Sequence, residues 1–187
     1  MPLDATALPE YRPPASRRGT LLREGSNRTE HRYSLERGSN GTKCKWLTLV
    51  VLSRAASPSS LPLLYEGDAI EGRVELHLEQ AETIKAVILS VQAGTTAVGQ
   101  EEARFLTIQH TLWPAMGGQA SARMKGPYYW PFNLTLPSSV VVPEPSGNGA
   151  KGEYRLPPSF SERASPAYID YRIKVNVKRG MFKVDHP

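Results

Sequence analysis

The sequence has little of what builds a disulfide-bonded, membrane-spanning or secreted protein. Cys44 is the only cysteine among 187 residues, so the chain forms no internal disulfide and a reducing compartment is expected. The longest apolar run, residues 46–52, is far shorter than the roughly 20 residues that a membrane helix needs. Residues 1–14 hold no apolar segment of the kind that a secretory signal requires. These absences predict a soluble cytosolic protein without a transmembrane segment.

A sustained helical period is also missing, and the alternating pattern of β-strands takes its place. The clearest strand lies at 169–177, where apolar and polar residues alternate as in a strand with one buried face. Arg179 and Gly180 then predict a turn, after which Phe182 and Val184 resume the alternation. Six further stretches have strand patterns: 46–52, 67–79, 84–91, 105–113, 128–136 and 140–142. Seven strands separated by turn signals predict an all-β protein, an antiparallel β-sandwich.

Two details of this pattern make specific predictions about packing. In the strand at 67–79 the apolar residues that face inward are Ile70, Val74, Leu76 and Leu78. Gly72 lies on the same inner face, which predicts a bulge or a close backbone approach there. The Gly-rich and Pro-rich stretches at 115–125 and 143–155 are predicted to be loops.

The positive charge is concentrated near the N-terminus. Residues 1–45 hold nine Lys and Arg against five Asp and Glu, whereas the rest of the chain is nearly balanced. A nucleic-acid-binding domain needs a basic patch on the fold itself, so the charge distribution disfavours that function. Residues 1–43 are rich in Pro, Arg, Ser and Gly without a regular period, which predicts a disordered basic tail. In this tail Thr20 and Ser34 lie near arginines, and they are either phosphosites that switch the charge or ordinary solvated residues.

Motifs for enzymes and cofactors are weak. Residues 147–152 match GxGxxG, but prolines precede the match and residues 153–157 cannot begin a helix, so a flexible loop is favoured over a dinucleotide site. The four histidines lie far apart without the spacing of metal ligands, and no serine lies in a GxSxG turn. The sequence therefore predicts no catalytic residue, no metal site and no cofactor.

The strand at 169–177 also carries the strongest candidate binding surface. Arg172, Lys174 and Lys178 lie on its polar face together with Asp170. Such a positive face is suited to an acidic or phosphorylated peptide. The alternative is a solvated sheet face that binds nothing.

Several short motifs follow one another in a fixed order along residues 45–185. They are YEGDAIEGRV at 65–74, IKAV at 84–87 with Gly94, GPYYWPF at 126–132, LPPSF at 156–160 and IDYRIKV at 169–175. This set resembles the N-terminal domain of arrestin-like proteins, and residues 156–163 are especially similar to fungal arrestin-related proteins of the α-arrestin family. The resemblance implies an immunoglobulin-like β-sandwich over residues 44–187, which in the family is followed by a second sandwich.

Arrestin-like proteins of this kind are non-enzymatic cytoplasmic adaptors that act at the plasma membrane or endosome. The resemblance implies that the chain binds cytosolic tails of membrane transporters or receptors and directs them to ubiquitin-dependent endocytosis. The family recruits a HECT-type ubiquitin ligase through Pro-Pro-x-Tyr, an extended motif that WW domains bind. This chain has no such motif, so contact with a ligase is expected to be indirect.

Other interpretations of the sequence stay open. The chain ends at Pro187, before the second sandwich, and a truncated product without function is one alternative. A generic β-sandwich that binds proteins in a trafficking coat is another. An enzyme built on a β-sandwich is a third, although the sequence shows no nucleophile with its base.

Overall fold

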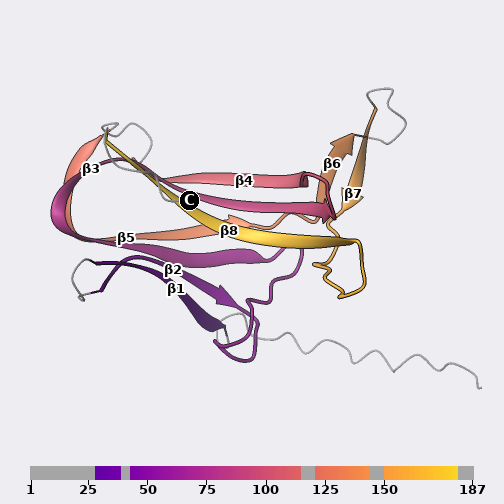
Figure 1. Cartoon of the computed structure of the whole chain (residues 1–187), viewed down its shortest axis with the longest axis horizontal. Coiled ribbons are helices and arrows are strands. Elements are labelled where there is room, and N and C mark those ends of the chain that lie inside the picture. The colour runs from indigo at the N-terminus through magenta and orange to yellow at the C-terminus, as the bar shows by residue number, and fades with distance from the viewer. Residues whose placement is uncertain (1–27, 39–42, 115–120, 144–149, 181–187) are drawn as a thin grey trace, which may run out of the picture.

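The computed structural model describes residues 28–38, 43–114, 121–143 and 150–180, which form eight β-strands (Figure 1). The strands are β1 (Thr29–Arg37), β2 (Cys44–Ser53), β3 (Ala69–Ala97), β4 (Ala103–Trp113), β5 (Ala122–Thr135), β6 (Ser139–Pro143), β7 (Lys151–Arg155) and β8 (Ala167–Arg179). Every strand pairing is antiparallel, so the predicted all-β class is confirmed. No described segment forms a helix with the length and apolar character that a bilayer crossing requires.

The long strand β3 belongs to two layers of the molecule. Its first half pairs with β2 on one edge and with β5 on the other, and β1 extends this layer beyond β2. Its second half pairs with β4 and with β8. Figure 1 shows β3 bending at one end of the molecule as it passes from one layer to the other. The register with β5 shifts between Leu78 and Glu82, where the strand bends. The arrangement is consistent with the predicted β-sandwich.

The core lies between these two layers because alternation along each strand turns one set of side chains inward. All four residues predicted to face inward from the first half of β3 are buried. They pack in one cluster with residues from the second half of β3, from β5 and from β8, among them Val87, Leu89, Phe132 and Val177. Both layers therefore share a single hydrophobic core.

β3 approaches its neighbours closely at Gly72. A Cβ atom at this position would overlap the carbonyl oxygen of Val50 and would lie 2.7 Å from Cζ of Phe132. The predicted close backbone approach is confirmed. A side chain cannot fit here while β2 and β5 remain paired with β3 on either side.

A charged cluster lies at the bend of β3. Glu82 is buried and pairs with Arg37 (Nη1 to Oε1, 2.7 Å) and with Arg179 (Nη1 to Oε2, 3.8 Å). Both guanidinium groups also lie over the ring of Trp46, at 4.7 and 4.4 Å from its centroid. The sequence predicts Arg179 in a turn, and this is wrong because β8 pairs with β3 through Arg179 and buries its side chain. The strand predicted around Phe182 and Val184 lies outside the described residues.

Four further boundaries differ from the sequence prediction. The loop predicted at 115–125 is wrong for residues 122–125, which belong to β5 because that strand pairs with β3 as far as Ala122. Residues 29–37 form β1, although the predicted disordered tail extends to residue 43. The reason is that β1 buries only His31 and is held by its pairing with β2, which leaves no apolar period to detect. β7 forms inside the predicted loop at 143–155 because it pairs with β6. The predicted strands at 67–79 and 84–91 are two halves of β3, since the chain between them bends and does not turn back.

Candidate functional site

A row of polar side chains crosses the outer face of the first layer. Ser34 of β1 is the register partner of Thr48 of β2, which is the partner of Glu75 of β3, and Glu75 is in turn the partner of Tyr129 of β5. Directly opposed residues lie on the same face of a sheet, so the four strands bring these four side chains into one line. Residues distant in the sequence thereby line one surface.

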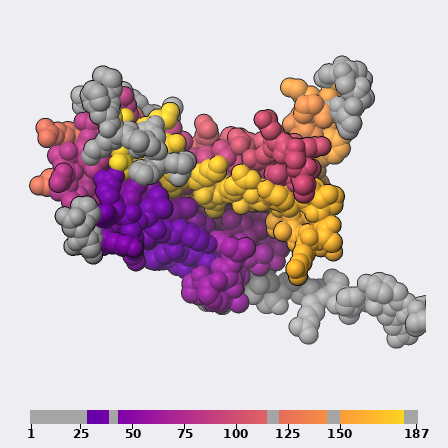
Figure 2. Space-filling view, viewed as in Figure 1, coloured from indigo at the N-terminus to yellow at the C-terminus, as the bar shows by residue number. Residues whose placement is uncertain are grey.

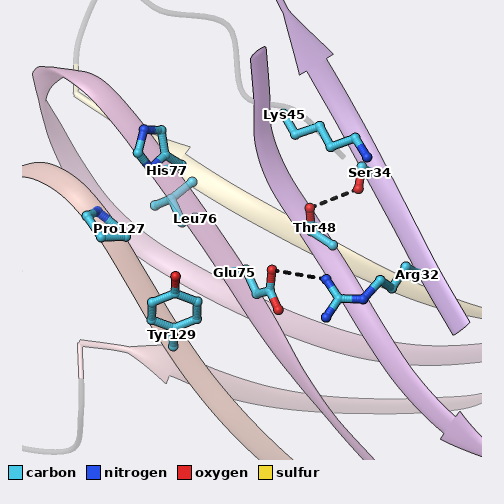
Figure 3. Close-up of a pocket in the computed structure, with 9 residues that line it drawn as sticks. All are labelled: Arg32, Ser34, Lys45, Thr48, Glu75, Leu76, His77, Pro127 and Tyr129. Carbon is cyan, nitrogen blue, oxygen red and sulfur yellow. Dashed lines mark hydrogen bonds and ion pairs between the residues drawn. The ribbon is translucent and has the colours of Figure 1, made fainter. Parts of the chain in front are cut away.

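This row forms the floor of a hollow of about 270 Å³, which we call the outer-face hollow (Figure 3). Its lining residues are Arg32, Ser34, Lys45, Thr48, Glu75, Leu76, His77, Pro127 and Tyr129. Arg32 borders one side of the row, and Lys45 and His77 border the other (Figure 3). The side chains of Arg32, Lys45, His77 and Tyr129 are exposed, so the hollow is open to a ligand.

Lys45 reaches the hollow because of an irregularity in the strand pairing. The register of β1 with β2 shifts between Leu35 and Glu36, so that Leu35 is opposite Leu47 and Glu36 is opposite Lys45. Such a bulge re-aims the side chains that follow it. Trp46 is consequently buried in the core, while Lys45 lies on the outer face.

Ion pairs hold the arginine at the edge of the hollow. Arg32 Nε lies 2.6 Å from Oε1 of Glu30, and its Nη1 lies 3.6 Å from Oε2 of Glu75. Arg73 bridges the same two carboxylates, at 3.2 Å from Glu30 and 2.7 Å from Glu75. Hydrogen bonds from Arg73 and then Arg32 lower the pKa of Glu30. Hydrogen bonds to Glu75 and Glu30 raise the pKa of Arg73, which favours the charged form of Arg73.

Lys45 and His77 are the other basic side chains that line the hollow. Among the described residues, no carboxylate forms an ion pair with Lys45 or with His77. The hydroxyl groups of Ser34 and Thr48 hydrogen-bond each other at 2.9 Å, and each keeps capacity for a further bond. Positive charge beside hydroxyl groups is the chemistry that binds carboxylate or phosphate. The outer-face hollow is therefore suited to an anion.

The charged face predicted on β8 has a different character. Arg172 donates to both oxygens of Asp170, at 2.5 and 2.9 Å, and it also lies 3.2 Å from Glu102. The hydrogen bond to Asp170 is the main reason why the pKa of Arg172 is raised. Two carboxylates thus offset its charge, while Lys174 and Lys178 form no ion pair with described residues. These three residues lie on the second layer and are not part of the outer-face hollow.

Lys174 instead borders a small apolar slot between the layers. The slot has a volume of about 160 Å³ and is lined by Leu35, Leu47, Leu49, Ile173, Lys174 and Val175. Figure 2 shows β8 running along the β1–β2 pair on this side of the molecule. Among the described strands β1 pairs only with β2, and β8 only with β3, so one backbone edge of each borders the opening. An extended apolar segment could bind here.

Of the two phosphosites weighed from the sequence, Ser34 lies in the outer-face hollow and Thr20 lies outside the described residues. Sequence patterns missed the hollow because its residues come from four strands and depend on register. No protein-family model matches the chain, and no curated protein matches it either. Across the described ranges, no three His, Cys, Asp or Glu residues come together in a way that could hold a metal ion.

Proposed function

We propose that the chain is a non-enzymatic, arrestin-like adaptor domain that binds acidic or phosphorylated cytosolic tails of membrane transporters or receptors. In this proposal it acts in the cytoplasm at the plasma membrane or endosome and contributes to ubiquitin-dependent endocytosis. A HECT-type ligase joins through another protein, because the chain lacks Pro-Pro-x-Tyr. The observation that carries the proposal is the outer-face hollow, where Lys45 and His77 lie beside two hydroxyl groups and form no ion pair with a carboxylate of the described part of the chain.

The positions of the arrestin-like motifs support the same proposal. Residues 65–74 lead into the first half of β3, and residues 126–132 of β5 pair with that half. Residues 169–175 of β8 pair with its second half. One motif therefore lies largely in β3, and the two others pair with this strand. Such contact between motifs far apart in the sequence is expected if they belong to one fold.

Peptide binding tests the proposal directly. The probe is a fluorescein-labelled peptide with two phosphoserines flanked by glutamates, and its unphosphorylated form is the comparison. We expect Lys45→Glu to weaken phosphopeptide binding about tenfold, which corresponds to about 1.4 kcal/mol. Lys151→Glu makes the same charge change on β7, remote from the hollow, and is expected to change affinity less than twofold.

Two results would contradict the proposal. An unmodified chain that binds neither peptide has no anion site, and the adaptor function then loses its support. Equal losses for Lys45→Glu and Lys151→Glu mean that only net charge matters, which removes the role of the outer-face hollow.

A protein-binding module of a trafficking coat is the second candidate, and the apolar slot favours it. Such a module binds an extended apolar segment through a free strand edge and needs no anion site. Affinity purification from cells distinguishes the two functions. Coat subunits without transporters or ligase in the eluate support the second candidate, whereas transporters support the first.

A further inference from the structure

Ser34 lies in the floor of the outer-face hollow, where its hydroxyl group can be modified as well as contact an anion. Its side chain is exposed, and its hydroxyl hydrogen-bonds Thr48 at 2.9 Å. β1 is an edge strand, paired only with β2 among the described strands, and it is already extended. An enzyme that acts on extended peptide segments can therefore approach Ser34 from the open side of the sheet.

The charges around Ser34 match those that a phosphate group binds. Arg32 lies two residues before it on the same face of β1, and Lys45 borders the hollow beside it (Figure 3). Glu75 lies against these two cations in the lining of the hollow, and Glu30 pairs with Arg32 at 2.6 Å. Glu36, two residues after Ser34, opposes an added phosphate, but it is exposed and its register partner is Lys45. Counted over Arg32, Lys45 and Glu75 alone, the lining of the hollow carries one net positive charge, and a phosphoserine carries about −1.5 to −2.

We propose that Ser34 is a phosphorylation site whose phosphate occupies the outer-face hollow and thereby blocks the binding of anionic tails. A protein kinase transfers the γ-phosphoryl group of ATP to Oγ of Ser34: the bond to the β-phosphate oxygen breaks, the Oγ–P bond forms, and the hydroxyl proton and ADP leave. Thr48 then donates its hydroxyl to a phosphate oxygen, in place of its bond with the Ser34 hydroxyl. The inference rests on the proposed function, because it makes Ser34 a regulator of the same site.

The intramolecular position gives the Ser34 phosphate an advantage over an incoming tail. It is attached beside the cations, so its effective concentration there greatly exceeds that of a separate peptide. It also offsets the positive charge that attracts a tail. Phosphorylation of Ser34 is thus expected to release bound cargo and not to strengthen its binding.

The first experiment asks whether the modification occurs. The full chain is incubated with ATP and a serine/threonine kinase that prefers arginine two residues before its target, and phosphosites are mapped by mass spectrometry. We expect a phosphate group on Ser34 of the parent chain and no phosphate at position 34 of the Ser34→Ala variant. A chain that is never modified at Ser34 overturns the assignment of the site.

The second experiment asks what the phosphate does. Phosphoserine is incorporated genetically at Ser34, and at Ser59 as the matched control, because Ser59 lies in an exposed loop and its side chain bonds only Ser57. We expect phosphoserine at position 34 to weaken binding of the doubly phosphorylated fluorescein peptide at least tenfold, and the control to change it less than twofold. Equal affinities of the two modified chains overturn the inference.

Phosphorus NMR keeps the inference separate from the proposed function. Cations around the Ser34 phosphate are expected to lower the midpoint of its second ionisation, near pH 6 when free, by about half a pH unit relative to the control, and Lys45→Ala is expected to reverse the shift. Absence of peptide binding to the unmodified chain refutes the proposed function while this shift still supports an occupied hollow. A phosphate at Ser34 that titrates like the control refutes the inference. This result is also expected if the modification weakens peptide binding only by detaching β1, because the phosphate then lies away from the cations.

Discussion

Ser53 is the residue whose removal most sharply tests how β1 and the following loop are held. Its side chain is 1% exposed, and its Oγ accepts hydrogen bonds from the backbone N–H groups of Ala55 and Leu63, each at 3.1 Å. Its third contact is Nε2 of His31, at 2.8 Å. A hydroxyl oxygen has two lone pairs, and both are taken by the N–H groups, so the O–H must donate to the imidazole. Nε2 of His31 is therefore the acceptor of this bond, which assigns the tautomer with its ring proton on Nδ1.

Replacing Ser53 with alanine removes all three bonds at once. The Ala55 N–H and the His31 Nε2 remain buried without a partner, whereas the partly buried Leu63 N–H regains some hydrogen bonding from water. A buried polar group left unsatisfied costs about 1–3 kcal/mol. We expect Ser53→Ala to lower the free energy of unfolding by about 2–4 kcal/mol, a large fraction of the 5–15 kcal/mol typical of a domain.

Urea denaturation followed by tryptophan fluorescence measures this loss, with a linear extrapolation to water. Ser60→Ala is the matched control, because Ser60 is exposed in the same loop, and its unfolding free energy is expected to change by less than about 0.5 kcal/mol. A loss below about 1 kcal/mol for Ser53→Ala would show that the hydroxyl does not organise the loop, and the tautomer derived for His31 would lose its basis.

Three further predictions concern the core and the ion pairs. Gly72→Ala is expected to destabilise the fold by about 1–3 kcal/mol through overlap with Val50, and urea denaturation that gives an unchanged stability would refute the close approach. Glu82→Gln leaves the buried guanidinium group of Arg179 and the partly exposed one of Arg37 without their carboxylate, and is expected to cost about 3 kcal/mol; a calorimetric melting temperature equal to that of the parent chain would contradict this. A hydrogen bond from Arg54 lowers the pKa of Asp68, so the stability that this pair adds is present above pH 4 and is lost as the pH falls through the lowered pKa. The melting temperature of Asp68→Asn should therefore fall less between pH 5 and pH 3 than that of the parent chain. Equal decreases in melting temperature would show that the pair adds no stability.

The strands with strong apolar alternation could be predicted from the sequence because burial on one face leaves a period of two. The first half of β3 illustrates this, since Ile70, Val74, Leu76 and Leu78 are all buried as expected. Gly72 was also predictable, because a glycine among inward apolar residues signals a neighbour too close for a side chain. Patterns of this kind reflect which residues of a strand are buried, and this burial can therefore be predicted from the sequence.

The outer-face hollow could not be predicted because it depends on register between strands and not on local burial. Lys45 is part of it only because the bulge after Leu35 shifts the register by one residue and turns the lysine outward. Without that shift, alternation from Thr48 would place Trp46 on the outer face and Lys45 toward the core. β1 itself was missed because its alternate residues are mostly charged. Ion pairs across the sheet, and not the burial of apolar side chains, hold these residues, so no apolar period marks the strand.

β1 connects the two candidate binding surfaces, because successive residues of a strand face opposite sides of its sheet. Ser34 faces the outer-face hollow, whereas Leu35 lines the apolar slot beside β8. Pairing with β2 along a single edge, ion pairs to β3 and the His31–Ser53 bond hold the strand. A change that displaces β1 must therefore alter both surfaces together. Ser53→Ala should weaken the binding of ligands to the hollow and to the slot alike, whereas Lys45→Glu should weaken binding to the hollow alone.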